Sequence, residues 1–250
     1  MSGALIVNAD DWGRDRQTTD QTLACVRRGT VSAVSAMMFM EDSERAAAIA
    51  RDSGIDAGLH LNLTTAFSAR RCSARLIEHH DRITGYLRRY AFTRVIFNPR
   101  LIRSFEYVVG AQVDEFRRIF RTEVMRVDGH HHMHLCANVL MGGLLPRGTI
   151  VRRNFSFGAC EKSVWNRAFR SIEDSWLARR YRIADFFFSL PPMAPRRRLK
   201  RIFGLAAQFK VEVETHPIAA DEYDFLMGEE MAHLTANTVI CSSVAALSGR

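Results

Sequence analysis

The stretch ALIVNADDWG, residues 4–13, joins a short apolar run to a polar end with two adjacent aspartates. An unbroken apolar run of this length predicts a strand buried on both faces, as in a parallel sheet. The following segments alternate: helical spacing over 18–29 ends in a glycine, 31–40 is apolar, 41–54 is an alanine-rich helical segment, and 55–63 is apolar again. This β-α-β-α-β order predicts parallel strands joined by right-handed crossovers.

The rest of the chain continues the alternation with one interruption. Residues 66–110 are polar and arginine-rich, and they predict a partly helical excursion. Helices are predicted over 111–122 and 163–181 and at the start of a basic segment after the turn at 191–195, and strands over 123–130, 148–153, 183–190, 210–216 and 238–244. Seven or so strands alternating with helices predict one α/β domain over 1–250. We expect a (β/α) barrel-like fold, an incomplete or distorted TIM-type barrel, although the pattern alone does not exclude an open sheet.

The composition is that of a globular protein, with 47% apolar and 25% charged residues in a chain of 250. The net charge of +8 favours anionic partners such as phosphate-bearing substrates, anionic lipid surfaces or nucleic acid, but the spread of the basic residues also fits a merely basic surface. We expect no signal peptide and no membrane-spanning helix. Five scattered cysteines without a C-x-x-C pair predict free thiols in a reducing cytoplasm.

Polar clusters follow three of the predicted strands: NADDWG at 8–13, GLHLNL at 58–63 and DGHHHMH at 128–134. The carboxyl ends of parallel strands meet at one edge, so these segments are expected to form one pocket. Two histidines and a carboxylate make a common hydrolytic metal site that leaves room for water and substrate. Asp11, His60 and one histidine of the 130–134 run supply that set.

Alternation along an extended chain separates neighbouring side chains within these clusters. Asp10 and Asp11 are therefore expected to point in opposite directions and to have different roles, one binding a cation and the other taking a proton. The histidines of the run divide in the same way unless the chain turns after Gly129. If the run is extended, His130, His132 and His134 lie on one face and His131 lies on the other. Alternation alone leaves the metal ligand among them open.

Four other histidines lie outside these clusters. His216, in ETHPI at the end of a predicted strand, is a candidate general acid, with a turn histidine as the alternative. His79 and His80 lie in the polar excursion and are expected to be solvated, and His233 is expected on a surface helix. The sequence contains no phosphate-binding glycine loop and no serine-hydrolase G-x-S-x-G motif.

Four motifs together resemble those of the YdjC-like carbohydrate deacetylases: LIVNADDWG, GLHLNL, VDGHHHMH and, more loosely, EVETHP. The resemblance is good over 4–65 and 123–136, weaker over 148–217, and poor over 66–110 and after 218. It implies a (β/α) barrel-like fold. It also implies removal of the acetyl group from N-acetylated amino sugars, with one divalent metal ion as cofactor.

The resemblance also implies roles for individual residues. The metal ligands it implies are Asp11, His60 and His130. It implies Asp10 as general base towards water and His216 as the acid that protonates the departing amine. We assign to substrate binding the further motif residues His132, His134, Asn62 and Trp12. The resemblance implies Mg²⁺, whereas two imidazoles and a carboxylate also suit Zn²⁺.

Two other classes of function compete with this interpretation. One is a metal-dependent hydrolase of another bond, such as a phosphoester, which the basic charge favours. The other is a non-enzymatic, basic nucleic-acid-binding protein, for which the arginines at 196–198 are the one local candidate, although they are more typical of a solvated helix start. We expect an N-acetylated amino-sugar partner, no nucleic acid and no stable membrane insertion. Whether the chain forms a homodimer is left open.

Overall fold

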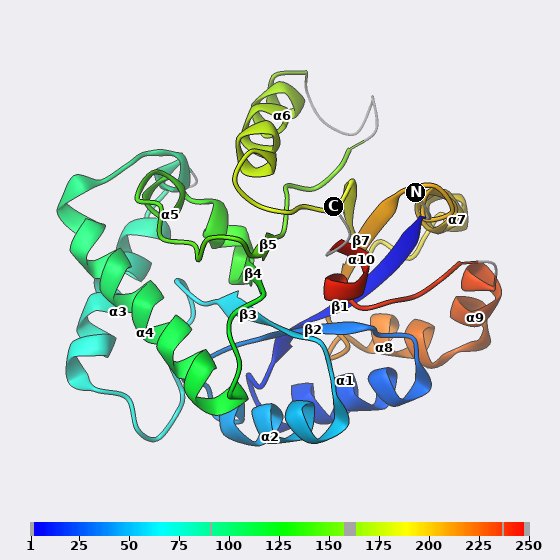
Figure 1. Cartoon of the computed structure of the whole chain (residues 1–250), viewed down its shortest axis with the longest axis horizontal. Helices are drawn as coiled ribbons and strands as arrows, with labels where there is room; N and C mark the ends of the chain where they lie inside the picture. The colour runs from blue at the N-terminus through cyan, green and yellow to red at the C-terminus, as the bar shows by residue number, and fades with distance from the viewer. Residues whose placement is uncertain (1–2, 91, 158–163, 237, 248–250) are drawn as a thin grey trace. The chain divides into compact units, whose positions relative to one another are not determined.

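The computed structural model describes residues 3–90, 92–157, 164–236 and 238–247 (Figure 1). Its strands are β1 (Ala4–Trp12), β2 (Ala33–Ala36), β3 (Ala57–Leu61), β4 (Arg126–Gly129), β5 (Ile150–Val151), β6 (Phe186–Ser189) and β7 (Lys210–Thr215). Its α-helices are α1 (Arg16–Arg28), α2 (Ser43–Ser53), α3 (Ala74–Leu87), α4 (Ile102–Phe120), α5 (Ala137–Met141), α6 (Val164–Ala178), α7 (Arg196–Leu205), α8 (Ala220–Met227), α9 (Glu229–Thr235) and α10 (Ser243–Leu247). Short 3₁₀ helices are η1 (Thr93–Val95), η2 (Pro99–Leu101) and η3 (His130–Leu135).

The strands form one seven-stranded sheet in the order β5-β4-β3-β2-β1-β7-β6. The pairs β1–β7, β6–β7 and β3–β4 are parallel, as the alternation of strands and helices predicts. Every residue of β1 is buried, which agrees with its unbroken apolar start. Among the described strands β5 and β6 stand at the two ends of the order, as in an incomplete barrel. The predicted fold class is therefore confirmed.

The contacts within the chain divide it into two compact units. Unit 1 comprises Met1–Ala9, Asp20–Val34 and Arg147–Arg250, and unit 2 comprises Asp10–Thr19 and Ser35–Pro146. Strand β1 begins in unit 1 and ends in unit 2, so its apolar start and its two aspartates belong to different units. One domain over 1–250 stays a prediction, and each unit is described by itself below.

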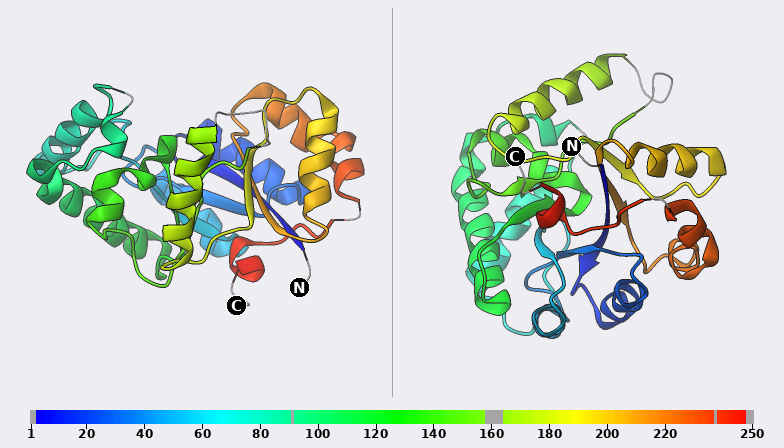
Figure 2. Two further views of the ribbon diagram at one scale, coloured as in Figure 1. Left: turned by 90° about the horizontal axis from the view of Figure 1, so that it is seen from above. Right: turned by 45° about the vertical axis from the view of Figure 1, so that its right-hand side comes forward.

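In unit 2, helices α3 and α4 lie side by side (Figures 1 and 2). The predicted helix over 111–122 is only the second half of α4, because the apolar stripe of this helix already begins within the predicted excursion. Phe105, Val108 and Phe116 on that stripe are all fully buried. Buried Gln112 of α4 donates from Nε2 to the Asn62 carbonyl at 2.9 Å and accepts from the Asn62 N–H at 2.8 Å. This double hydrogen bond fixes the chain directly after β3.

In unit 1, β7 lies between β1 and β6, and part of the apolar core gathers Ala4, Ile6, Ala33, Ile150, Ala184, Ala246 and Leu247. The strand predicted at 238–244 is wrong: a single bridge joins Ile240 to Leu5, and α10 begins at Ser243. Ser242 Oγ accepts the Ala245 N–H at 3.1 Å, a turn that starts the helix instead of continuing a strand. Within the described residues, no helix is both long enough and apolar enough to cross a membrane.

Candidate metal centre

The two aspartates at the end of β1 approach the same histidine. Asp10 Oδ2 lies 4.0 Å and Asp11 Oδ1 3.4 Å from His60 Nε2. The prediction that the two side chains point in opposite directions is therefore wrong. Its premise, an extended chain, ends at Asp11, whose φ of +64° is left-handed. Aspartate is one of the few residues that adopt this conformation at moderate cost, and here it turns the second carboxylate towards the first.

His60 lies on β3 and is 1% exposed. The parallel register pairs it with Asp128 on β4. His60 Nδ1 lies 2.7 Å from Asp128 Oδ1, in the carboxylate–histidine arrangement that fixes a tautomer. Because Nδ1 faces Asp128, Nε2 is the ring nitrogen that faces Asp10 and Asp11.

Asp128 is held in turn by two buried neighbours. Its Oδ2 accepts from Ser35 Oγ at 2.5 Å and from Arg126 at 2.7 Å. The same Arg126 nitrogen lies 3.1 Å from Ser35 Oγ. Gly58 leaves the space for this guanidinium, because a Cβ at Gly58 would lie 2.7 Å from Arg126 Cζ. These side chains form a rigid support beneath His60.

Sequence reasoning missed this support. Asp128 belongs to the DGHHHMH motif but has no predicted role, and Ser35 and Arg126 lie inside predicted strands. The one usable signal was alternation on β4, which places Arg126 and Asp128 on the same face. It cannot show that His60 lies opposite them, since that depends on the register between β3 and β4.

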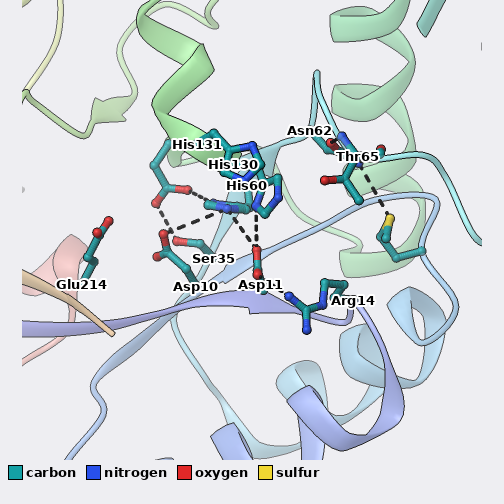
Figure 3. A network of polar contacts seen from close by, with 12 residues as sticks. Asp10, Asp11, Arg14, Ser35, His60, Asn62, Thr65, His130, His131 and Glu214 are labelled. Carbon is teal, nitrogen blue, oxygen red and sulfur yellow. Dashed lines mark hydrogen bonds and ion pairs between the residues drawn. The ribbon is translucent and has the colours of Figure 1, made fainter. Parts of the chain in front are cut away.

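His130 brings the third ligand-type atom. Its Nδ1 lies 3.0 Å from Asp11 Oδ1, and its side chain is 11% exposed. The second oxygen of Asp11 accepts from Arg14 Nη1 at 2.9 Å. Asp11 therefore uses one oxygen towards the two histidines and the other towards an arginine, which fixes the plane of its carboxylate (Figure 3).

The histidine run is a turn and not an extended segment. Residues 130–135 form η3, in which His131 and His132 have φ values of 54° and 58°. The face-by-face division expected for an extended chain does not apply, because the chain turns after Gly129. A Cβ at Gly129 would lie 2.9 Å from the His134 backbone nitrogen, so glycine permits this close approach.

His131 does not turn away from the cluster. Its ring centroid is 4.0 Å from that of His130, and its Nδ1 lies 2.9 Å from Thr64 Oγ1. Burial, together with the neighbouring His130, lowers the pKa of His131. The contact of His131 with the ring of His130 gives it a means of supporting that residue.

The charges around His60 favour a cation. Burial alone would lower the pKa of His60, but Asp10, Asp11 and Asp128 outweigh burial and raise it to about 10. For Asp11 the directions are reversed: burial alone would raise its pKa, but its contacts with His130 and His60 hold that pKa well below the usual range. Three buried carboxylates thus stabilise a positive charge at the His60 ring.

The donor set has the chemistry of a divalent-metal site. Oδ1 of Asp11 and one ring nitrogen each of His60 and His130 lie within 4.8 Å of one another, and all come from unit 2. Donors around a tetrahedral zinc ion are about 3.3–3.4 Å apart, and Asp11 Oδ1 lies 3.4 Å from His60 Nε2 and 3.0 Å from His130 Nδ1. Asp11, His60 and His130 form the candidate metal centre, called the metal centre below.

The remaining predicted site residues have other surroundings. Asn62 is fully buried and donates from Nδ2 to the Thr65 carbonyl at 2.7 Å, and fully buried Trp12 donates to the Ala46 carbonyl at 3.1 Å. Both contacts are structural, and binding of substrate by either residue stays a prediction. The same holds for His132, which is partly exposed, and for His134, which is fully buried.

Three histidines outside the proposed metal ligands give a mixed outcome. His233 is exposed on α9, as predicted. His80 is 1% exposed and packs against the Phe67 ring at 4.3 Å, so the expectation that it is solvated is wrong. His79 is partly buried and lies 3.0 Å from Ser104 Oγ. Helix α3, which is part of the predicted excursion, is amphipathic, and His80 lies on its buried face.

Known proteins are similar in sequence to about half of this chain. A chitooligosaccharide deacetylase from Serratia marcescens is 27% identical over 136 residues, 54% of this chain and 52% of that protein. A carbohydrate deacetylase from Mus musculus is 29% identical over 140 residues, 54% of this chain and 44% of that protein. The chain thus spans about half the length of the curated relatives it matches.

The fold has a known counterpart. A solved structure from Enterococcus faecalis V583, named as a proposed cellobiose-phosphate cleavage protein, superposes with a TM-score of 0.72 at 15% identity. The match covers 99% of this chain and 100% of that one. The family model described as YdjC-like protein matches residues 4–237, which include every residue of the metal centre. The chain therefore belongs to the YdjC-like protein family.

Proposed function

We propose that this protein is a metal-dependent carbohydrate N-deacetylase, which hydrolyses the N-acetyl amide of an amino sugar and releases acetate. The observation that carries the proposal is the convergence of one carboxylate and two imidazoles within 4.8 Å, with Asp10 beside them. The names of the curated relatives, chitooligosaccharide and carbohydrate deacetylases, support the reaction class.

Asp11, His60 and His130 would hold the cation. When bound, a divalent cation supplies Lewis acidity, which polarises a carbonyl group and makes a water molecule more acidic. Two imidazoles favour zinc, and the YdjC-like resemblance favours magnesium. Asp128 keeps the Nδ1 side of His60 engaged, so the ring can offer only Nε2 to the cation.

Asp10 is the proposed general base. Its carboxylate is 3% exposed and lies on the same side of His60 as Asp11. Asp11 is committed to His60, His130 and Arg14, which suits a ligand, whereas a carboxylate next to the ligand set can take the proton of the attacking water.

His216 is the proposed acid that gives a proton to the departing amine. It directly follows β7, whose last residue Thr215 pairs with Ala9, the residue before Asp10. Glu222 Oε2 accepts from the Thr215 hydroxyl at 2.7 Å and from the His216 N–H at 2.9 Å, which fixes the backbone of His216. The His216 side chain is 35% exposed, so a substrate could reach it.

The form of the substrate and the cellular location of the protein are also proposals. The acetylated sugar can be free, lipid-linked or part of a metabolite. The described cysteines (Cys25, Cys72, Cys136 and Cys241) are thiols, which supports the reducing cytoplasm expected from the sequence.

The test is release of acetate from di-N-acetylchitobiose by purified protein loaded with zinc or magnesium, with p-nitrophenyl phosphate as a second substrate. We expect acetate release that ceases with His60→Ala and persists with His233→Ala, an exposed histidine outside the centre. Hydrolysis of the phosphoester with no release of acetate from any acetylated sugar would replace the proposal with the competing hydrolase. Salt-sensitive binding to random oligonucleotides without hydrolysis would favour a nucleic-acid-binding protein.

A further inference from the structure

An exposed apolar loop lies between α3 and α4 in unit 2. Four of its large side chains are each 49–56% exposed: Tyr90, Phe92, Val95 and Ile96. Four of the ten exposed large apolar side chains in the described part of the chain therefore lie within seven positions. Single exposed apolar residues are ordinary on a protein surface, whereas a cluster of them marks an interaction site.

Hydrogen bonds hold this loop in a fixed conformation. Thr93, the polar residue in its middle, is buried, and its hydroxyl lies 3.1 Å from the Leu87 carbonyl oxygen and 2.6 Å from that of Tyr90. The Tyr86 hydroxyl donates to the Ile96 carbonyl at 2.8 Å, which fixes the far end of the loop. The loop thus buries its polar side chain and exposes its apolar ones, the reverse of the usual arrangement.

A neighbouring helix extends the apolar surface. The 3₁₀ helix η1 contacts both α3 and α5, and α5 lies beside one end of the α3–α4 pair (Figure 1). Asn138 of α5 donates from Nδ2 to the Asn98 carbonyl at 2.8 Å and accepts the Asn98 N–H at 3.0 Å. Met141, the last residue of α5, is 71% exposed. We call Met141 and the described, exposed residues within 88–96 the arginine–apolar patch.

The arginines of this region have no acidic partners. Between Asp81 and Glu106 the chain contains no acidic residue and six arginines, all of them exposed: Arg82, Arg88, Arg89, Arg94, Arg100 and Arg103. Within the described residues none of the six forms an ion pair, whereas Arg118, further along α4, pairs with Glu115 at 2.7 Å. Arg103 lies in the first turn of α4, where a positive charge opposes the helix dipole. The local charge therefore favours an anionic partner.

We propose that the arginine–apolar patch binds the surface of an anionic lipid bilayer, with its apolar side chains among the headgroups and its arginines against the lipid phosphates. Aromatic and aliphatic side chains beside basic residues are typical of proteins that lie on such a surface. Binding of this kind is peripheral and reversible, and it needs no membrane-spanning helix.

Other partners fit the patch less well. Val95, Ile96 and Met141 have no flat ring on which a nucleic-acid base could stack. A symmetric dimer built on the patch would bring the same arginines of two copies together, which like charge opposes. The proposal does not depend on the deacetylase function, because no residue of the patch belongs to the metal centre.

The test is sedimentation of the full chain with lipid vesicles in EDTA, so that no divalent cation bridges protein and lipid. One set of vesicles contains phosphatidylcholine with about one third phosphatidylglycerol, and the other contains phosphatidylcholine alone. We expect at least about tenfold tighter binding to the anionic vesicles, weakened by high salt, because the arginines bind through lipid charge. No binding to anionic vesicles at millimolar lipid, or equal binding to both kinds, would overturn the proposal.

Arginine variants locate the charged part of the contact. Arg89→Gln with Arg94→Gln should weaken binding to anionic vesicles about tenfold, since each arginine near the surface contributes separately. The matched control, Arg70→Gln with Arg71→Gln, removes the same charge from exposed positions before α3, about 20 Å away along that helix. It should change binding less than about threefold. Equal losses in the two double variants would reduce the effect to overall charge and contradict the site.

Apolar variants test the other half of the contact. Phe92→Ser with Ile96→Ser should also weaken vesicle binding about tenfold, because less apolar surface enters the headgroup region. Ile172→Ser with Val239→Ser, at exposed positions of unit 1, is the control and should bind as the wild type does. Equal binding by these two double variants would contradict a role for the apolar side chains.

Two further measurements exclude the other partners. In analytical ultracentrifugation, a dimer that Phe92→Ser with Ile96→Ser converts to a monomer would assign the patch to a second copy of the chain. Random oligonucleotides that bind more tightly than the anionic vesicles, and lose affinity with Arg89→Gln and Arg94→Gln, would assign it to nucleic acid. Either result would overturn the proposal, and we expect neither.

Discussion

The metal centre and the arginine–apolar patch, both in unit 2, are built in opposite ways. The metal centre buries one carboxylate and two imidazoles almost completely, and the backbone is left-handed at Asp11 and at the two residues that follow His130. The patch exposes guanidinium groups, aromatic rings and aliphatic side chains. One set of residues favours a cation and the other an anionic surface, so a chain with a net charge of +8 can present both kinds of site.

The difference teaches where precision is required. A cation ligated at a few points needs each donor held in place, and the support under His60 provides this through Asp128, Ser35 and Arg126. A lipid surface contacts many side chains at once and tolerates small displacements of each. Substitutions should therefore be far more damaging at the metal centre.

Among substitutions that leave the proposed ligands in place, the largest effect is expected from Asp10→Asn. The amide cannot accept the proton of water, so kcat for acetate release should fall about 10²–10⁴-fold while the chain still binds the metal. Acetate release and metal content are measured on the same preparation. Asp114→Asn, an exposed aspartate of α4, is the control. Full activity of Asp10→Asn would remove Asp10 as the base.

Asp128→Asn is expected to come next. The amide can rotate either its oxygen or its NH₂ towards His60 and loses the charge that Arg126 contacts, so metal affinity should fall about 10–100-fold. The matched control is Asp174→Asn, another buried aspartate paired with an arginine, but in unit 1. A similar loss of metal affinity in both variants would mean general destabilisation and not a support for His60.

Metal affinity should also depend on pH. The pKa of His60 is raised to about 10, so both ring nitrogens carry a proton in the metal-free protein at neutral pH. A cation must displace the proton on Nε2. Affinity should rise about tenfold per pH unit from pH 7 towards that pKa. Titrations in buffers of different ionisation enthalpy measure the proton released. Affinity that falls with rising pH would contradict this assignment.

A smaller effect is expected from His131→Ala. This change removes the contacts with the His130 ring and Thr64 but no proposed ligand, so activity should fall less than about tenfold. His130→Ala, measured in parallel, should abolish activity. A reversed order would assign the ligand role to His131.

The smallest effect tests the separation of the two sites. Arg89→Gln with Arg94→Gln should change metal affinity by less than about twofold, because neither residue belongs to the metal centre. Metal binding by this variant is measured by the same titration. A large loss would show that the two sites are coupled and not separate.

Much of the fold could be predicted from the sequence because buried parallel strands are read directly as apolar runs. The run over 4–9 became β1, and the glycine after the second predicted helix is its left-handed C-cap, Gly54, with φ +64°. The strand predicted over 238–244 is wrong because a short apolar run does not distinguish a strand from a loop with one bridge.

The candidate site was predictable as a set of residues and not as a geometry. Asp11, His60 and the histidine run could be chosen because they follow strands. Their arrangement depends on left-handed backbone at Asp11 and His131, which alternation does not anticipate. The support from Arg126 depends on the register between two strands and on the space above Gly58, and neither can be read from one sequence.

The central claim is that Asp11, His60 and His130 hold one divalent cation. Elemental analysis after dialysis against zinc, and separately against magnesium, tests it most directly. We expect about one equivalent per chain in the wild type and in the control His79→Ala with His233→Ala, and almost none in His60→Ala with His130→Ala. Equal metal content in the two double variants, or no metal in the wild type, would show that these residues do not hold the cation.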